Sequence, residues 1–393
     1  MTLTNDQYFA LDRLCKWYRR YQHQFIELAG IIGTGTTDVI REFIELSPLD
    51  PREIMYLSYD QKQVLELAYQ GHHAYYLNSI IYSYRRVTDF TTLPVINPRS
   101  AEVQSEWKLE LKTKIVDKYK LIVVHDSTLL PLQTIKDLST LELPIILIRD
   151  PMLLPSPESY TFLREPNLYL REINDEYASN PIVHFAHKLL RGDKLDYGNY
   201  DNVTIVPRKQ MNLYNLRSSD MNLTLTEGLR DEVNKIYREK ILGRKDTLNV
   251  VGERVIVSDP LYRERLKNDE NKKVRLYLTK GLVGHLSKVN KHQPGTRYIG
   301  VDFRPDGYHD SFVDLSLDRY FLNGITGNSR AERPDEVFKV EYAYALSSPL
   351  ARLSHWDKVT VILDYDPEHE KELQTRLAYS AITRARQTVT IVV

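Results

Sequence analysis

Short apolar runs alternate with stretches of helical spacing through the first part of the chain. Continuous apolar runs are typical of strands buried on both faces of a parallel sheet. They predict strands at 24–30, 53–59, 120–126 and 143–150. Apolar residues at helical spacing predict helices over 5–24, with Asn5 or Asp6 as the cap, and over 37–46. This alternation predicts a doubly wound α/β domain.

The pattern changes twice further along. A polar, Pro-containing stretch at 83–119 interrupts the α/β pattern and is interpreted as a small inserted hairpin. Apolar and polar residues alternate over 246–330, with turns between the runs, which predicts a small β-barrel inserted in a second α/β domain. The other elements predicted for that domain are helices at 180–193 and 370–385 and strands at 358–365 and 388–393.

Composition is that of an ordinary soluble globular protein. The 393 residues are enough for two or three domains, and 42% are hydrophobic and 27% charged. No apolar run approaches the length of a membrane span, and the N-terminus lacks a signal pattern. The single Cys15 excludes an internal disulfide framework. We therefore expect a cytoplasmic protein with no membrane partner.

Charge and aromatic content bear on the choice of partner. Lys plus Arg and Asp plus Glu both number 53, so the formal net charge is zero. Sequence-independent binding of nucleic acid normally needs an excess of basic residues. The 27 Tyr residues offer groups that stack on bases or anchor a protein. We expect most of them to be half-buried on strands and helix faces.

The stretch GIIGTGTT at 30–37 differs by one letter from a phosphate-binding loop. The pattern G-x-x-x-x-G-K-[ST] holds except that Thr36 stands where the Lys belongs. Thr37 keeps the hydroxyl position that ligates Mg²⁺. A predicted strand precedes the loop and a predicted helix follows it, as a phosphate loop requires. The loop therefore has the fold context of a nucleotide site without its charge.

Eight segments, in order, carry a resemblance to superfamily 1B DNA helicases of the RecD and bacteriophage Dda-like type. The resemblance covers nearly the whole chain. The segments lie at 3–11, 30–40, 71–84, 121–131, 147–157, 226–241, 341–362 and 377–393. It implies an α/β fold with two RecA-like P-loop domains. The first is 1–170, with the hairpin or wedge 83–119 inserted, and the second is 171–245 with 331–393. The stretch 246–330 would be an SH3-like β-barrel inserted in the second domain.

The resemblance also implies a nucleotide site between the domains. Its positions correspond to Gln7, Gly30, Gly33, Gly35, Thr36, Thr37, Asp150 and Arg384. Asp126 and Arg384 would occupy catalytic positions, and Thr37 and Asp126 the metal positions. Gln7 matches an adenine-reading glutamine, and Arg384 matches the arginine finger of the second domain.

Departures from the family pattern concentrate on this chemistry. Thr36 replaces the Lys that neutralises the phosphates. The pair His125-Asp126 replaces Asp-Glu, or, with the register shifted by one, Ser127 replaces the Glu, so one carboxylate is missing either way. Leu153 replaces a coupling Gln, and Asp175 replaces a phosphate-sensing Arg. Further replacements fall at Asp60, Pro349, Leu350, Arg352 and Leu353.

The leading hypothesis is a catalytically degenerate, helicase-like protein without ATP turnover. We expect a phage-type accessory factor in DNA replication or recombination, acting in the host cytoplasm. Its partners would be single-stranded DNA, a replication or recombination protein, or an active helicase paralogue. No cofactor is expected, the alternative being weakly bound ATP and Mg²⁺. No DNA-contacting residue can be singled out from the sequence.

Two alternatives stay open. In the first, Thr37, Asp126 and Arg384 suffice for an active, atypical ATP-dependent 5′→3′ DNA helicase. In the second, the chain is a protein-interaction module, such as a decoy, inhibitor or partner subunit, that binds neither ATP nor DNA. Single residues also have structural alternatives. Gln7 would then cap the first helix, His125 would be a core histidine, Trp356 would pack between the domains, and Arg384 would be a helix-end cation.

Overall fold

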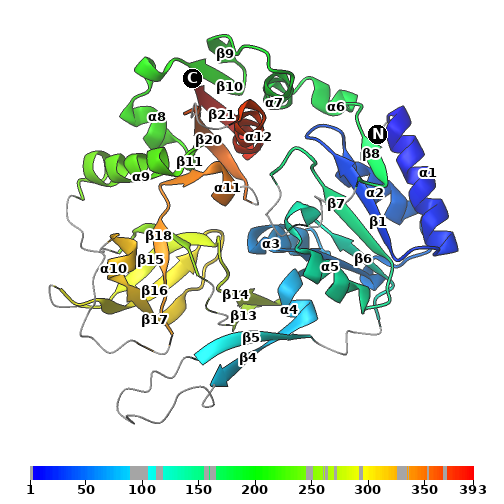
Figure 1. The fold of residues 1–393 in the computed structure, drawn as a ribbon, viewed down its shortest axis with the longest axis horizontal. Coiled ribbons are helices and arrows are strands. Elements are labelled where there is room, and N and C mark those ends of the chain that lie inside the picture. Colours follow the sequence, from blue (N-terminus) through cyan, green and yellow to red (C-terminus); the bar gives the residue numbers. More distant parts are fainter. Residues whose placement is uncertain are drawn as a thin grey trace.

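The computed structural model describes most of the chain, in three sheets with their helices and two separate hairpins (Figure 1). The described residues are 3–88, 105–111, 118–154, 159, 165–244, 251–259, 261, 264–269, 272–291, 295–324, 334, 336–351, 354–365 and 370–393. The fold is mixed α/β with parallel sheets. No helix in these ranges is long and apolar enough to cross a membrane.

The first lobe is a six-stranded parallel sheet in the order β3-β2-β6-β7-β1-β8. Its strands are β1 (Phe25–Gly30), β2 (Ile54–Ser58), β3 (His73–Tyr76), β6 (Leu121–Val124), β7 (Ile145–Arg149) and β8 (Leu168–Leu170). Its helices are α1 (Asn5–Arg20), α2 (Thr36–Leu46), α3 (Gln61–Tyr69), α4 (Leu77–Ile81) and α5 (Leu132–Ser139). Two apolar clusters, one with α1 and α2 and one with α4 and α5, lie on alternate strand residues. Burial on both faces explains the continuous apolar runs.

The first helix begins at the predicted residue, but its N-cap and its C-terminal end differ from the prediction. Its N-cap is Thr4, where Asn5 or Asp6 was predicted, because the Thr4 hydroxyl accepts the Gln7 N–H and the Gln7 side chain accepts the Thr4 N–H. The helix ends at Arg20, since Tyr21 adopts a left-handed backbone with φ of 44°. The predicted end at residue 24 was too late, because the apolar spacing continues beyond the residue at which the backbone leaves the helical conformation.

The second lobe is another six-stranded sheet, in the order β19-β11-β20-β21-β10-β9, parallel except for β9. Its strands are β9 (Gly198–Tyr200), β10 (Val203–Val206), β11 (Met221–Thr224), β19 (Ala345–Ser347), β20 (Trp356–Ile362) and β21 (Ala385–Val392). Its helices are α6 (Asp175–Ala178), α7 (Pro181–Arg191), α8 (Leu213–Ser218), α9 (Glu227–Ile236), a π-helical turn Tyr237–Ile241, α11 (Ser348–Ala351) and α12 (Lys371–Ile382). Trp356 is buried in this lobe's core.

A five-stranded antiparallel sheet, here called the insert, enters between α9 and β19. Its order is β17-β16-β15-β12-β18, and its parts are β12 (Arg254–Val257), β15 (Val283–Val289), β16 (Tyr298–Pro305), β17 (Phe312–Asp318), α10 (Arg319–Leu322) and β18 (Val340–Tyr342). Phe338 bridges to Leu317 of β17 just before the chain enters β18, so the two edges of the sheet approach one another. The SH3-like assignment of this sheet stays a prediction.

Two hairpins stand apart from the sheets. One pairs β4 (Tyr82–Thr88) with β5 (Ser105–Leu111), inside the stretch 83–119 interpreted as a hairpin. The other pairs β13 (Glu264–Asp269) with β14 (Lys272–Tyr277). In Figure 1 both lie at the side of the molecule between the insert and the first lobe.

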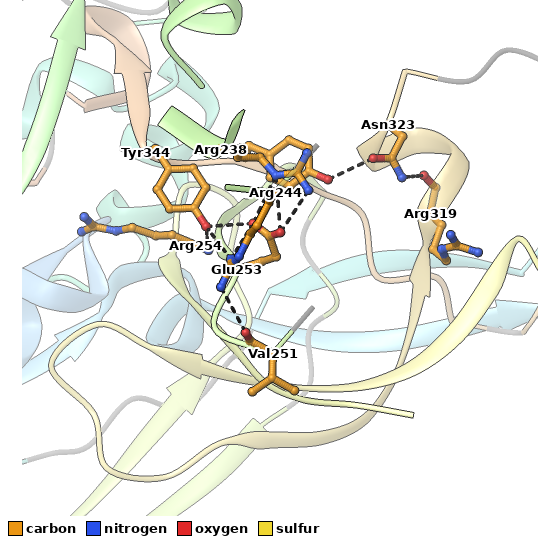
Figure 2. A network of polar contacts seen from close by, with 9 residues as sticks. Arg238, Arg244, Val251, Glu253, Arg254, Arg319, Asn323 and Tyr344 are labelled. Carbon is orange, nitrogen blue, oxygen red and sulfur yellow. Dashed lines mark hydrogen bonds and ion pairs between the residues drawn. The ribbon is translucent and has the colours of Figure 1, made fainter. Parts of the chain in front are cut away.

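A buried ionic cluster joins the insert to the second lobe at the point where the chain passes between them (Figure 2). Glu253 is fully buried and accepts hydrogen bonds from Arg238 and from the Tyr344 hydroxyl, at 3.0 and 2.8 Å. Arg244 lies 3.2 Å from its second carboxylate oxygen. The ring of Tyr237 stacks on Tyr344 at 4.7 Å. The insert is therefore tied to the π-helical turn on one side and to the strand connection at 344 on the other.

Candidate functional site

The Gly-rich loop connects β1 to α2 with a backbone that only glycine adopts easily. Gly33 and Gly35 have φ of 87° and 69°. A Cβ on Gly33 would lie 2.7 Å from Val183 of the second lobe. The first amides of α2, those of Thr36 and Thr37, follow directly and have no acceptor within the helix by its geometry. The backbone therefore presents the N-terminus of α2 to the loop, and such a helix N-terminus favours the binding of an anion.

A cavity of about 310 Å³ lies in front of the loop, between the two lobes. The first lobe contributes the loop, the start of α2, Gln63, and the ends of β6 and β7. The second contributes Tyr177, His355, Thr383 and Arg384. Its lining comprises Gly30, Ile31, Ile32, Gly33, Gly35, Thr36, Thr37, Asp38, Gln63, His125, Asp126, Ile148, Arg149, Asp150, Leu153, Tyr177, His355, Thr383 and Arg384.

Acidic groups outnumber the cations available to the cavity. The carboxyl groups in its lining are those of Asp38, Asp126 and Asp150, and the guanidinium groups are those of Arg149 and Arg384. Arg149 forms a buried ion pair with Glu27 at 3.0 Å, which takes its charge. Asp38 is likewise paired, with Arg41 at 2.9 Å. This leaves Arg384 against Asp126 and Asp150, and no lysine is among the described residues that line the cavity.

Burial moves the pKa of several groups here. It raises the pKa of Asp150 to about 6, against a hydrogen bond from Tyr379 that lowers it. Burial also raises the pKa of Asp126, although the Arg384 charge opposes this. The pKa of His125 falls to about 4 because of burial and the charge of His72. The pocket therefore holds a neutral imidazole at physiological pH.

The structure brings together most of the residues that the family pattern placed at a nucleotide site. Gly30, Gly33, Gly35, Thr36, Thr37, Asp126, Asp150 and Arg384 all line the cavity. Arg384 is 5% exposed, and its Nε donates to the Ser380 carbonyl at 3.0 Å. Within the described residues, no group of three or more His, Cys, Asp or Glu side chains is placed to hold a metal ion.

Gln7 lies behind the loop and is not among the residues that line the cavity. It is completely buried, and its Nε2 donates to the Thr34 carbonyl at 2.9 Å. Its Oε1 accepts the Thr4 N–H at 2.8 Å. Both ends of the amide are therefore engaged by the chain itself, in the capping role that was the structural alternative for this residue.

Asp175 also lies away from the cavity lining. It is the first residue of α6 and is exposed, whereas Tyr177 of the same helix lines the cavity and its hydroxyl donates to Asp38 at 3.3 Å. The charge reversal inferred for position 175 thus does not act from the lining. Leu153, in place of the coupling Gln, does line the cavity and is 4% exposed. Arg352 and Leu353 lie outside the described residues.

Contacts between the lobes involve side chains that the motif comparison missed. Tyr379 of α12 accepts the Ile32 N–H at 2.9 Å and donates to Asp150. Arg376, one turn earlier, donates to the carbonyls of Pro151, Met152 and Leu153 at 2.9 to 3.1 Å. Their one sequence signal was the helical i, i+3 spacing, which sets both on one face of α12.

An apolar contact accompanies these bonds. Leu153, which the first lobe supplies, belongs to the buried core of the second lobe. Ile31, Ile32, Met152 and Leu154 pack against the same core. On α7, His187 Nε2 lies 2.8 Å from the Ile32 carbonyl, which accepts its hydrogen bond. The Gly-rich loop is thus held by the opposite lobe through both side chains and backbone.

No protein-family model matches the chain, and no curated protein matches it. Among solved structures, the chain is similar in fold to Pif1 helicases, which belong to superfamily 1B. A chain from two coordinating Pif1 helicases at forked double-stranded DNA is 11% identical with a TM-score of 0.49, and the match covers 100% of this chain and 92% of that one. Pif1 helicase from Candida albicans is 13% identical with a TM-score of 0.44, and the match covers 100% of this chain and 95% of that one. Pif1 helicase from Bacteroides in complex with ADP-AlF3 and single-stranded DNA is 13% identical with a TM-score of 0.46, and the match covers 100% of this chain and 92% of that one.

These likenesses concern the fold and establish no activity for this chain. The structures named are Pif1 helicases, and the narrower RecD and Dda-like assignment stays a prediction.

Proposed function

We propose that the chain is a catalytically degenerate helicase-like protein that does not turn over ATP and serves as an accessory factor, of phage type, in DNA replication or recombination. The RecD and Dda-like assignment and the SH3-like nature of the insert belong to this proposal. The observation that carries it is the charge of the cavity, where Arg384 remains against Asp126 and Asp150 once the ion pairs of Arg149 and Asp38 are set aside.

Phosphoryl transfer depends mainly on positive charge around the phosphates and on a positioned base. At the loop, the neutral hydroxyl of Thr36 replaces an ammonium group. Asp126 and Asp150, both near Arg384, compete with phosphate for its charge. A polyphosphate entering the cavity would meet more negative than positive charge, which opposes binding.

The water-activating group is missing as well. His125 is neutral and hydrogen-bonds to Gln63 at 3.3 Å, and Asp126 has a raised pKa. Asp150 is engaged by Tyr379. These residues do not provide the two carboxylates that hold Mg²⁺ and orient the attacking water. The residues present therefore do not fit ATP–Mg²⁺ chemistry.

The first test is titration calorimetry with ATP and Mg²⁺, followed by phosphate release with and without single-stranded DNA. We expect no turnover from the natural chain. Thr36→Lys should increase nucleotide affinity but still give no turnover, because the base is absent. Leu46→Lys adds the same charge at the exposed far end of α2, outside the cavity lining, and is the matched control. DNA-stimulated turnover by the natural chain would refute the proposal.

The accessory role divides into DNA binding and protein binding, which a salt series separates. Anisotropy of labelled single-stranded DNA is measured at several salt concentrations. An affinity that falls steeply with salt supports phosphate contacts and a DNA-bound role. No binding at low salt removes DNA from the proposal and leaves a replication or recombination protein as the partner.

A further inference from the structure

We propose that the Gly-rich loop serves as a lock between the lobes, which stay closed without any nucleotide. The inference deepens the proposed function and rests on it in one respect, namely that the loop is free of its phosphate-binding role. Domains that close around a ligand usually rely on the ligand to bridge them. In this chain, side chains of the second lobe provide the bridges themselves.

Tyr379 is the central bridge. It is completely buried, and its hydroxyl connects two parts of the first lobe, the Ile32 amide in the loop and the Asp150 carboxylate after β7. Asp150 also accepts the Met152 N–H at 2.8 Å. A single hydroxyl from α12 thus satisfies one donor and one acceptor that would otherwise face the cavity.

Arg376 and His187 extend the lock on either side. Arg376 donates to three consecutive carbonyls, 151 to 153, which fixes the segment after β7 against α12. His187 bonds the Ile32 carbonyl, so both backbone groups of Ile32 have partners in the second lobe. Directed bonds to backbone atoms specify one relative position of the lobes.

The two isoleucines of the loop explain why closure is favourable as well as specific. Ile31 and Ile32 occupy loop positions that face the second lobe, where they pack on its apolar core with Leu153. Opening the lobes would expose this apolar surface to water. The sequence GIIGTGTT is therefore explained as a loop that docks on the second lobe. Gly33 is needed in it because Val183 leaves no room for a Cβ.

A second contact, remote from the cavity, reinforces closure. Leu65 of α3, in the first lobe, is 5% exposed and belongs to the buried core of the insert. On the same helix, Glu66 pairs with Arg386 of β21. The insert is itself fixed to the second lobe by the Glu253 cluster, so this contact also resists opening.

The test measures the distance between the lobes by fluorescence energy transfer in the full chain. Dyes are attached at Tyr8→Cys and Tyr214→Cys, both exposed, in a Cys15→Ser background. Tyr8 lies on α1 and Tyr214 on α8, at opposite ends of the molecule (Figure 1). We expect one narrow distance distribution without nucleotide, unchanged by ATP and Mg²⁺.

The lock variant combines Tyr379→Phe with Arg376→Ala. It should raise the ratio of open to closed molecules roughly tenfold or more, because several hydrogen bonds are lost together. The milder Arg376→Lys keeps the charge but cannot reach three carbonyls, and it should give a smaller rise if the double variant fails to fold. Tyr365→Phe with Lys371→Ala, both exposed, is the matched control and should leave the distribution unchanged.

The outcomes separate this inference from the proposed function, since phosphate release is measured on the same samples. A broad distribution that narrows only with ATP and Mg²⁺ would overturn the lock, and so would a lock variant identical to the natural chain. If the lobes stay closed without nucleotide while ATP is hydrolysed, closure by these side chains stands, but the loop still binds phosphate and the proposed function fails. If they close only with ATP and nothing is hydrolysed, the reverse holds.

Discussion

Two side chains that line the cavity, Asp150 and His125, give opposite dependences of stability on pH. The pKa of Asp150 is raised from 3.8 to about 6, so the folded state takes up its proton first and stability from this group rises as pH falls from about 6 to about 4. The pKa of His125 is lowered from 6.5 to about 4, so the unfolded state takes up that proton first. Stability from His125 therefore falls over nearly the same range.

Substituting either group should leave only the pH dependence of stability that the other group contributes. Asp150→Asn leaves the His125 effect, so the free energy of unfolding should fall more steeply than in the natural chain between pH 6.5 and 4. His125→Asn leaves the Asp150 effect and should make the fall shallower. Asp126, Arg384 and Tyr379 face Asp150 and stay unchanged in both variants. Urea unfolding across this pH range measures the slopes.

The exposed substitution Asp12→Asn controls for loss of a carboxylate and should run parallel to the natural chain. Equal slopes for Asp150→Asn and His125→Asn would show that neither group titrates as the structure indicates.

Between elements, a buried polar cluster forms around Glu253 (Figure 2). Glu253 directly precedes β12. Its carboxylate forms ion pairs with Arg238 of the π-helical turn and with Arg244, and it accepts a hydrogen bond from Tyr344, which precedes β19. Arg238 also lies over the Tyr342 ring, 4.1 Å from its centroid. The end of the second lobe's helical segment, the start of the insert and the connection at 344, which is 91 positions from Glu253, thus share one buried charge.

Glu253→Gln should be strongly destabilising. The largely buried Arg238 and the partly exposed Arg244 would lose their counter-charge, and breaking a buried pair from one side typically costs about 3–5 kcal/mol. Asp12→Asn breaks an exposed pair with Lys16 and should cost about 0–1 kcal/mol. Chemical denaturation measures both. A cost for Glu253→Gln as small as for Asp12→Asn would mean that the cluster does not hold the insert.

Across the whole molecule, apolar cores are shared between parts that the chain order keeps apart. Leu153 belongs to the second lobe's core although it follows a strand of the first lobe. Leu65 belongs to the core of the insert although it lies on α3. Shared cores couple the folding of the parts that share them, so we expect thermal unfolding in a single calorimetric transition.

Leu65→Ala combined with Leu153→Ala should split that transition. Each substitution removes buried apolar contact, with a typical cost of about 2–5 kcal/mol, and each lies at a junction between parts. Leu138→Ala, within one core of the first lobe, is similarly buried and should lower the transition temperature without separating the first lobe from the insert and the second lobe. A single transition in the double variant would contradict this coupling.

Much of the architecture could be predicted from local patterns. Buried parallel strands are continuous apolar runs whatever their neighbours, so β1, β2, β6 and β7 fall within the predicted ranges. The Gly-rich loop was recognisable because a strand, a positive-φ turn and a helix follow in a fixed order. Ends of elements were predicted less well, as at Thr4 and Tyr21, since caps depend on individual backbone angles.

The sequence by itself determined which residues could form the cavity and which charge the loop lacks, because residue identity sets charge and backbone freedom directly. Only the tertiary structure decided how those residues are used. It set Gln7 behind the loop, Asp175 on the surface, and Tyr379 and Arg376 against the first lobe. The contacts of Tyr379 and Arg376 join residues more than two hundred positions apart. No local pattern encodes such pairs, since they arise only when the two sheets pack together.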